Sequence, residues 1–209
     1  MFWILSLLLT FLSSLTLADD VDVQWHDASL FEIEGRGWEK TATPYGRLPD
    51  SAESKVNGLE WELSNNNPGI CIRFLTDAPA LKVRWSLIKP GLAMPHMAAT
   101  DVSGVDLYTR SGSGSWVFVG NGRPHKRGDN VGTFEFRGKG KAEHECLLYL
   151  PAYNGIISLE LGVPSGARLE KPEPRPTARL KPVVVYGTSI AQGACASRPG
   201  RFQRSRRLV

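Results

Sequence analysis

The stretch Asn66-Asn67-Pro68-Gly69-Ile70-Cys71-Ile72-Arg73-Phe74 decides the fold, because it sets a turn directly before a short apolar run. Asn, Pro and Gly favour a turn, and a short run of β-branched and aromatic residues is typical of a strand. A second run of this kind follows at Leu81-Lys82-Val83-Arg84-Trp85. Apolar and charged residues alternate in it, which predicts a strand with one face in the core.

The same pattern recurs along residues 19–163, where Asn57-Gly58, Asn121-Gly122 and Asn154-Gly155 separate some of the runs and are expected to form hairpin turns. No amphipathic helix of ten residues is evident. Short strands at this spacing predict a mainly β fold, a jelly-roll-like antiparallel β-sandwich. The nine expected strands are 30–34, 59–63, 70–74, 81–85, 105–108, 116–119, 133–136, 146–150 and 156–161.

Beyond the sandwich, residues 164–181 contain Pro164, Pro172, Pro174 and Pro176 with charged residues between them. This composition predicts a stiff, extended linker. Residues 182–209 then begin with the apolar run Val183-Val184-Val185-Tyr186, which is typical of a strand buried on both faces. We interpret this segment as the start of an α/β domain.

The amino terminus, residues 1–18, is an apolar run that ends in Thr16-Leu17-Ala18 before Asp19 and Asp20. This is the pattern of a secretory signal peptide. The alternative is an uncleaved anchor, but 18 residues with several Ser and Thr are short for a membrane span. We therefore predict a secreted or periplasmic protein that has no membrane segment once the signal is removed.

Charge and cysteine content exclude two classes of function. The net charge is +4, but five of the last twelve residues are Arg, and without them the remainder is slightly acidic. A basic tail of this kind does not predict a nucleic-acid-binding face. Cys71, Cys146 and Cys195 have no spacing suited to zinc, so no metal and no cofactor is expected. Cys71 and Cys146 lie in expected strands and are interpreted as small buried apolar residues.

Ser189 is the candidate catalytic residue, because it follows the apolar run 183–186 and the strand breaker Gly187. The carboxyl ends of buried strands are where α/β folds place their chemistry. A serine at such a position is a nucleophile if a base reaches it. The alternative is that Ser189 only caps a helix.

Two motifs in this order resemble one family. Gly187-Thr188-Ser189-Ile190-Ala191-Gln192-Gly193 is similar to the first block of the SGNH/GDSL hydrolases, with Thr188 where the family usually has Asp. Gly104-Val105-Asp106-Leu107-Tyr108 matches the G-x-D-L-Y motif of the β-domain that precedes that hydrolase domain in one branch of the family. The resemblance implies an exported serine esterase acting on acylated carbohydrate, with Ser189 as the nucleophile.

In that family the Asp and His of the triad come from a later D-x-x-H block, which the 209 residues do not contain. We therefore expect a truncated catalytic domain and a chain that is inactive by itself. His26, His96, His125 and His144 all precede the linker and are interpreted as structural or solvated side chains. The segment 182–209 is expected to lack a surface to dock on, to be disordered and to promote self-association.

The alternative function is a non-catalytic β-sandwich that binds carbohydrate or packs on a partner. Asp106 could bind a sugar hydroxyl, but such an Asp more often accepts from a nearby backbone or Arg donor. The tryptophans at positions 25, 38, 61, 85 and 116 could form a stacking platform for sugars, although burial is the usual fate of a strand Trp.

Overall fold

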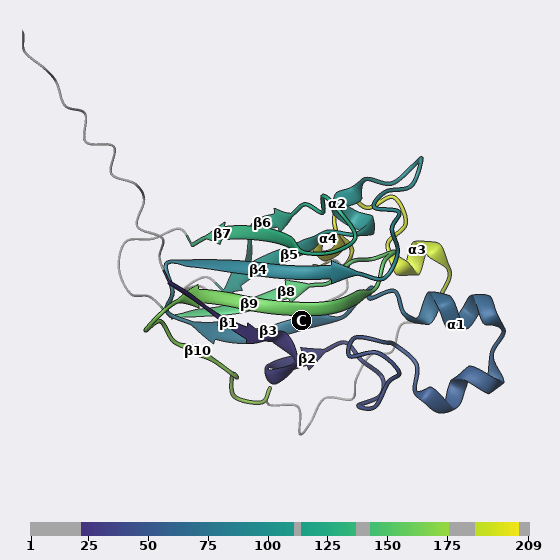
Figure 1. Cartoon of the computed structure of the whole chain (residues 1–209), viewed down its shortest axis with the longest axis horizontal. Coiled ribbons are helices and arrows are strands. Elements are labelled where there is room, and N and C mark those ends of the chain that lie inside the picture. The colour runs from purple at the N-terminus through teal and green to yellow at the C-terminus, as the bar shows by residue number, and fades with distance from the viewer. Residues whose placement is uncertain (1–21, 111–113, 137–142, 176–186, 205–209) are drawn as a thin grey trace, which may run out of the picture.

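The computed structural model is a two-layered β-sandwich with short helices at one end (Figure 1). Both sheets are antiparallel throughout, so the predicted fold class is confirmed. The residues that the structure describes are 22–110, 114–136, 143–175 and 187–204.

The first sheet has four strands, and the second has six. In the first sheet the strand order is β1 (Val23–Asp27), β9 (Ile156–Pro164), β4 (Ala80–Leu87) and β7 (Asn130–Glu135). In the second sheet the order is β10 (Leu169–Glu170), β3 (Cys71–Thr76), β8 (His144–Tyr149), β5 (Val105–Arg110) and β6 (Trp116–Gly122), with β2 (Glu32–Glu34) also paired to β3.

The core lies between the two sheets and follows from the alternation of the sequence. In β4, Leu81, Val83 and Trp85 are fully buried, whereas the residues between them are partly exposed. Gly122, in β6 of the facing sheet, makes room for the Trp85 ring, since a Cβ atom there would lie 2.9 Å from it. Each buried side chain of this size contributes about 1.5–3 kcal/mol of transfer free energy.

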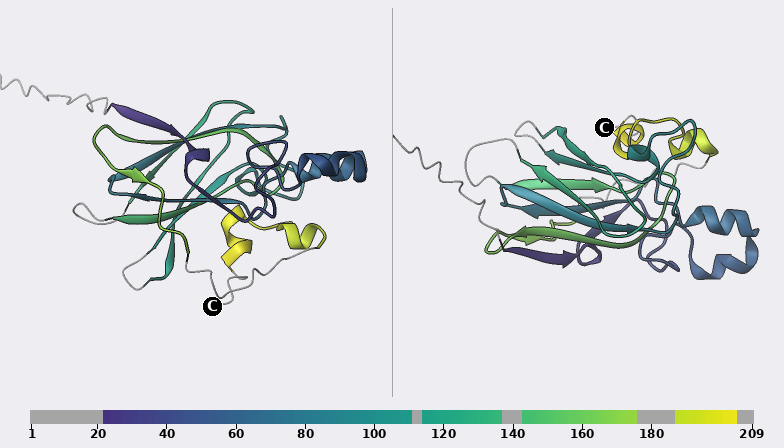
Figure 2. Two further views of the ribbon diagram at one scale, coloured as in Figure 1. Left: turned by 90° about the horizontal axis from the view of Figure 1, so that it is seen from below. Right: turned by 45° about the horizontal axis from the view of Figure 1, so that its top comes forward.

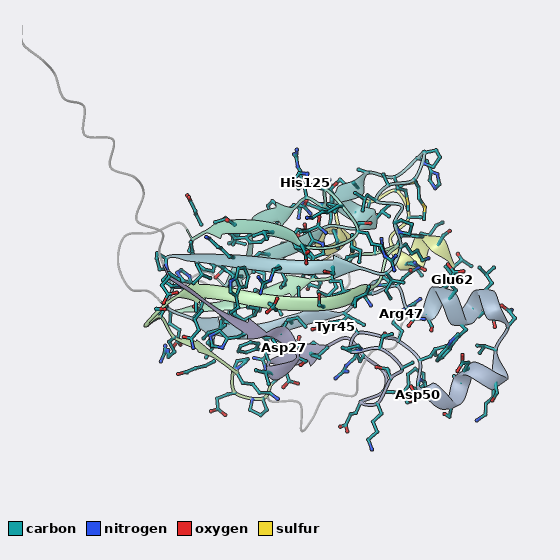
Figure 3. The ribbon with its side chains drawn as sticks, in the orientation of Figure 1. Asp27, Tyr45, Arg47, Asp50, Glu62 and His125 are labelled. Carbon is teal, nitrogen blue, oxygen red and sulfur yellow. The ribbon has the colours of Figure 1, made fainter. Side chains whose placement is uncertain are left out.

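The predicted strand 59–63 is wrong, because these residues lie in helix α1 (Gly58–Ser64). Asn57 caps the helix: its side chain accepts a hydrogen bond from the Glu60 amide, and Glu60 accepts one from the Asn57 amide. This capping box favours the helix over the local apolar-polar alternation. Arg47 holds the far end by donating to the Leu63 carbonyl at 2.7 Å (Figure 3).

The Asn-Gly pairs also differ from the prediction. Asn57 is the helix cap, and Asn121-Gly122 belongs to β6 rather than to a turn. Asn154-Gly155 does lie in the connection between β8 and β9, where the buried Asn154 side chain accepts from the Lys89 amide at 2.9 Å. Among the residues that are described, positive φ angles occur at other glycines, such as Gly69 and Gly114.

The remaining short elements complete the outline, and some of them alter the predicted boundaries. Residues 30–34 are only partly a strand, and β1 and β10 had no counterpart among the predicted runs. Because β10 pairs with β3, the sheet extends into the predicted linker 164–181. The other helical elements are η1 (Ala28–Leu30), η2 (Asp50–Lys55), α2 (Ala99–Val102), α3 (Ser189–Gln192) and α4 (Pro199–Arg204).

The expectation that the segment from residue 182 onward has nothing to dock on is wrong for residues 187–204. Helices α3 and α4 lie against the outside of the sandwich, and α4 contacts β5 and α2 (Figure 2). Polar and charged groups, together with the rings of Tyr108 and Phe118, supply the surface that holds this segment. The predicted signal peptide 1–18 and the expected strand 183–186 lie outside the described residues. Within the described ranges, no helix is long and apolar enough to cross a membrane.

Candidate active site and its support on the sandwich

Ser189 is the first residue of α3, and its side chain is exposed. Thr188 occupies the N-cap position with an extended backbone, so Ser189 itself does not cap the helix. In the part of the chain that is described, no hydrogen bond involves the Ser189 hydroxyl. The interpretation of Ser189 as a helix cap is therefore wrong.

The backbone of α3 is fixed by the connection between β8 and β9. The Tyr153 hydroxyl donates a hydrogen bond of 2.9 Å to the carbonyl oxygen of Ser189. The Gln192 side-chain amide donates one of 3.0 Å to the carbonyl oxygen of Ala152. Helix α3 ends at Gly193, whose φ of 109° requires glycine. The nucleophile candidate thus begins a single helical turn that is tied to the sandwich at both ends.

The loop between α3 and α4 is held by the region around α2. The Cys195 amide points at the sulfur of Met97 at 3.2 Å, and the Thr100 hydroxyl donates to the Ser197 carbonyl at 2.7 Å. Met97 closes a tight turn with Met94, and His96 is an exposed residue of that turn. These contacts join residues almost one hundred positions apart.

The strongest contact lies at Arg198-Pro199-Gly200. The Arg198 guanidinium donates to the Asp106 carboxylate at 3.1 Å and to the Tyr108 hydroxyl at 2.5 Å. It also lies over the Phe118 ring, 3.7 Å from the ring centroid. The Gly200 amide donates to the same Asp106 oxygen at 3.0 Å. Asp106 therefore accepts from both a backbone and an Arg donor, the interpretation favoured over a sugar-binding role.

The five residues of Gly104–Tyr108 divide into three roles. Gly104 has no room for a side chain, since a Cβ atom there would lie 2.4 Å from the Thr100 carbonyl oxygen. Val105 and Leu107 point into the main core. Asp106 and Tyr108 point to the opposite face of β5, as alternate residues of a strand do. The motif thus joins a core strand to the segment that carries Ser189.

Asp101 is a second buried carboxyl close to this contact. It is fully buried, and neither of its side-chain oxygens has a hydrogen-bond partner among the described residues. Burial, and to a smaller extent the neighbouring Asp106, raises the pKa of Asp101 to about 7. Burial also raises the pKa of Asp106, against the opposing effects of Asn121 and Arg198. Asp101 gave no signal in the sequence.

The predicted site residues are only partly brought together. Ser189 lies on the docked segment, and Asp106 lies on β5, the strand that binds this segment. Within the described ranges, no histidine forms a hydrogen bond with Ser189. His26 lies in β1, His144 stacks on Phe136 with ring centroids 4.3 Å apart, and His125 lies in the loop after β6 (Figure 3). Burial lowers the pKa of His144. The described residues hold no cluster of three side chains suited to a metal ion.

Sequence reasoning missed Tyr153 and Arg198. Tyr153 stands in a loop whose only visible feature was the Asn154-Gly155 turn, so it gave no signal. Arg198 lies in the stretch that follows the nucleophile block, where the sequence predicts only a solvated basic tail. A link between that arginine and Asp106 was open to inference, because Asp106 was expected to accept from an Arg or backbone donor.

The fold and these two motifs define the class of protein. Residues 23–169 match the family model GxDLY, described as the N-terminus of Esterase_SGNH_hydro-type. Residues 180–204 match a model of the GDSL-like lipase/acylhydrolase family. The chain belongs to the family of SGNH-type esterases with an N-terminal GxDLY domain. The two matches also agree with the order in which the motifs occur.

Solved structures support the assignment. A candidate GDSL-like lipase from Bacteroides ovatus ATCC 8483 is 30% identical, with a TM-score of 0.73 over 86% of this chain and 51% of that one. The salicylyl-acyltransferase SsfX3 from a tetracycline biosynthetic pathway is 16% identical, with a TM-score of 0.52 over 73% of this chain and 42% of that one, and shows the fold alone. The chain thus spans about half the length of these structures or less. No curated protein matches it.

Proposed function

We propose that this chain carries the N-terminal β-domain and the nucleophile segment of an exported serine esterase, with Ser189 as the nucleophile. The observation that carries the proposal is the position of Ser189. Its side chain is exposed at the start of α3 and makes no hydrogen bond to another described residue, while the backbone around it is anchored to the sandwich. A fixed backbone with an open hydroxyl is what nucleophilic attack requires.

In the proposed reaction the Ser189 oxygen forms a bond to the ester carbonyl carbon, and its proton passes to a base. The base then returns the proton to the leaving alcohol oxygen as the ester C–O bond breaks. Water hydrolyses the resulting acyl-serine by the same steps and releases the acid. The backbone amide of the serine could help to bind the oxyanion.

The general base for Ser189 is not among the residues that contact it in the described part of the chain. All four histidines of the sequence lie in the described residues, and none is bonded to Ser189 there. A serine without a base is a weak nucleophile at neutral pH. We therefore expect the 209-residue chain alone to be inactive, and activity to need an imidazole supplied by further polypeptide.

The substrate class proposed is an acyl group on a carbohydrate, with secretion or periplasmic export as the setting. The family membership supports ester hydrolysis, and the residues 1–18 support export. The amino-terminal residue of the protein recovered from the secreted or periplasmic fraction tests export. We expect it to be Asp19, and a chain that retains Met1 would contradict the signal-peptide interpretation.

The activity is tested on two proteins with p-nitrophenyl acetate and with acetylated xylan. One is this chain, and the other is residues 1–204 fused to the part of the Bacteroides ovatus protein that this chain does not cover. We expect hydrolysis by the fusion only, abolished by Ser189→Ala. A folded fusion without Ser189-dependent hydrolysis would contradict the esterase proposal. Ser189-dependent turnover by this chain alone would show that one of its own histidines acts as the base.

A non-catalytic carbohydrate-binding role is the second candidate. The observation in its favour is that Trp38 is half exposed, at 50%, whereas Trp85 is fully buried. An exposed indole can stack on a sugar ring. A titration of the chain with xylan oligosaccharides, followed by tryptophan fluorescence, tests it. Binding that is lost in Trp38→Ala would support this role, and an unchanged spectrum would exclude it for those sugars.

A further inference from the structure

We infer that Asp106 and Tyr108 form the docking site for the segment that carries Ser189, and that they act as positioning residues for this nucleophile. The positioning role rests on the proposed function, in which Ser189 is the nucleophile. The docking contact itself rests on the structure alone. It assigns a task to the two polar residues of the G-x-D-L-Y motif.

The first argument is the environment of Asp106. This carboxylate is fully buried. Apart from the Asn121 side-chain amide, which donates to Oδ1 at 2.7 Å, the groups among the described residues that donate hydrogen bonds to this carboxylate belong to the docked segment. A buried carboxylate is costly unless it is paired and hydrogen-bonded. The segment therefore satisfies a charge that the sandwich alone leaves poorly compensated.

The second argument is the fit at Gly200. A Cβ atom at this position would lie 2.3 Å from the Tyr108 ring and 3.0 Å from the Asp106 carboxylate. The Tyr108 ring has little freedom to move, because it packs edge-on against Phe118 and Tyr149 with centroids 5.5 and 5.6 Å away. Only glycine allows this close approach of the segment backbone to the strand.

The third argument is the geometry of Arg198. Its guanidinium contacts Asp106, Tyr108 and the Phe118 ring at once. Burial lowers the pKa of Arg198, but the charges and hydrogen bonds of Asp106 and Tyr108 outweigh it and raise the pKa overall. A planar guanidinium can stack on a ring through its face while it donates hydrogen bonds in its plane, which a lysine ammonium cannot do. The site is thus specific for arginine.

The contact reaches Ser189 through a short and anchored path. Between Arg198 and Ser189 lie one helical turn and one loop, tied by Tyr153, Met97 and Thr100 to the sandwich. Fixing the segment at Arg198 and Gly200 therefore restricts where the start of α3 can lie. Small displacements of a nucleophile lower rates strongly.

The docking contact is tested by amide hydrogen exchange on the 209-residue chain. In Arg198→Gln we expect the backbone amides of residues 193–198 and 200 to exchange at least ~10-fold faster, as loss of a charge-assisted hydrogen bond predicts. Core amides such as Leu107 should be unchanged. The matched control is Arg201→Gln, which removes the same charge from an exposed position of α4 and should change neither set.

Asp106→Asn tests the same contact from the sandwich side and should also speed exchange in the segment. If Arg198→Gln leaves the segment protected, or if both variants only lower the melting temperature of the whole chain, the docking role is overturned. Such a result would mean that Asp106 serves the sandwich and not the segment.

The positioning role is tested in the fusion protein described above. Arg198→Gln should lower kcat at least ~10-fold with little change in KM, and Arg198→Lys should recover only part of the loss. Equal kcat values in wild type and Arg198→Gln would overturn positioning. A fusion that is inactive even as wild type would count against the esterase proposal, while the exchange experiment would still decide the docking contact.

Discussion

The β-sandwich and the docked segment 187–204 are held by different forces. The sandwich is held by apolar side chains sealed between two sheets, with Trp85 and Leu148 fully buried. The segment is held mainly by polar contacts, of which the hydrogen bond from the Gly200 amide to Asp106 is buried and the Arg198–Asp106 ion pair is partly buried. Apolar burial is cooperative across the domain, whereas a few hydrogen bonds can open locally. The sandwich should therefore melt as one unit, and the segment should detach without unfolding it.

The largest effect is expected in the core. Trp85→Ala removes a ring that packs against Gly122 and donates to the Ser103 carbonyl at 3.2 Å. We expect the free energy of unfolding to fall by about 3–5 kcal/mol, measured by urea denaturation. Val117→Ala is the control, because Val117 is 48% exposed and its truncation should cost little. Equal effects of the two substitutions would contradict the assignment of Trp85 to the core.

The next effect concerns Asp101, which lies in α2, the helix that contacts α4 of the docked segment. Its pKa in the folded protein is about 7, above the ordinary value of 3.8, so the folded state binds the proton more tightly than the unfolded state. Between about pH 4 and 7 the free energy of unfolding should therefore fall as pH rises. Asp101→Asn should remove this dependence and stabilise the protein by ~1–3 kcal/mol at pH 8, with little change at pH 4.

Urea unfolding at pH 4 and pH 8 measures this difference. Glu39→Gln serves as the control. Because Glu39 is exposed, this substitution should leave the free energy of unfolding nearly unchanged at both pH 4 and pH 8. A pH profile of Asp101→Asn that is parallel to the wild type would show that Asp101 is already ionised or solvated.

Gly200→Ala is expected to have a smaller effect on the stability of the whole protein and to act locally on the docked segment. The added Cβ atom would clash with the Tyr108 ring, so the segment should detach. We expect faster exchange of its amides and a change of less than about 1 kcal/mol in the unfolding of the sandwich. Gly91→Ala is the control, because open space surrounds that position. Loss of the whole fold would show that the segment is part of the cooperative unit.

The smallest effect is expected at Ser189 itself. Its side chain is exposed and makes no hydrogen bond to another described residue, so Ser189→Ala should change the free energy of unfolding by less than about 0.5 kcal/mol. Thermal denaturation of the two proteins side by side tests this. A clear loss of stability would mean that the hydroxyl has a structural partner and is less open than described.

The two regions also differ in how well the sequence predicts them. Alternation in runs such as 81–85 is a local signal, and it correctly predicts most strands of the sandwich. It fails at 59–63, where the capping box at Asn57 and Glu60 favours a helix despite the alternation. The two-residue strand β10 is too short to leave a pattern.

The site is harder to predict, because its contacts join residues far apart in the chain. The nucleophile block and the G-x-D-L-Y motif were each visible, but nothing local states that Asp106 and Arg198 meet. The sequence predicts a disordered segment, because the apolar run 183–186 has no neighbouring strand in the sequence and the tail is rich in arginine. Its actual partners are the polar face of β5 and the Tyr153 hydroxyl, which no periodic pattern reveals.

The most direct test of the docked segment is the exchange rate of two amides in the wild-type chain at neutral pH. The Gly200 amide bonds to Asp106 at 3.0 Å, and the Ala194 amide bonds to the Ser189 carbonyl at 2.9 Å. We predict that both exchange at least ~10-fold more slowly than in an unstructured peptide, though faster than core amides such as Leu148. Exchange of both at the unstructured rate, with the core still protected, would show that the segment does not dock on the G-x-D-L-Y motif.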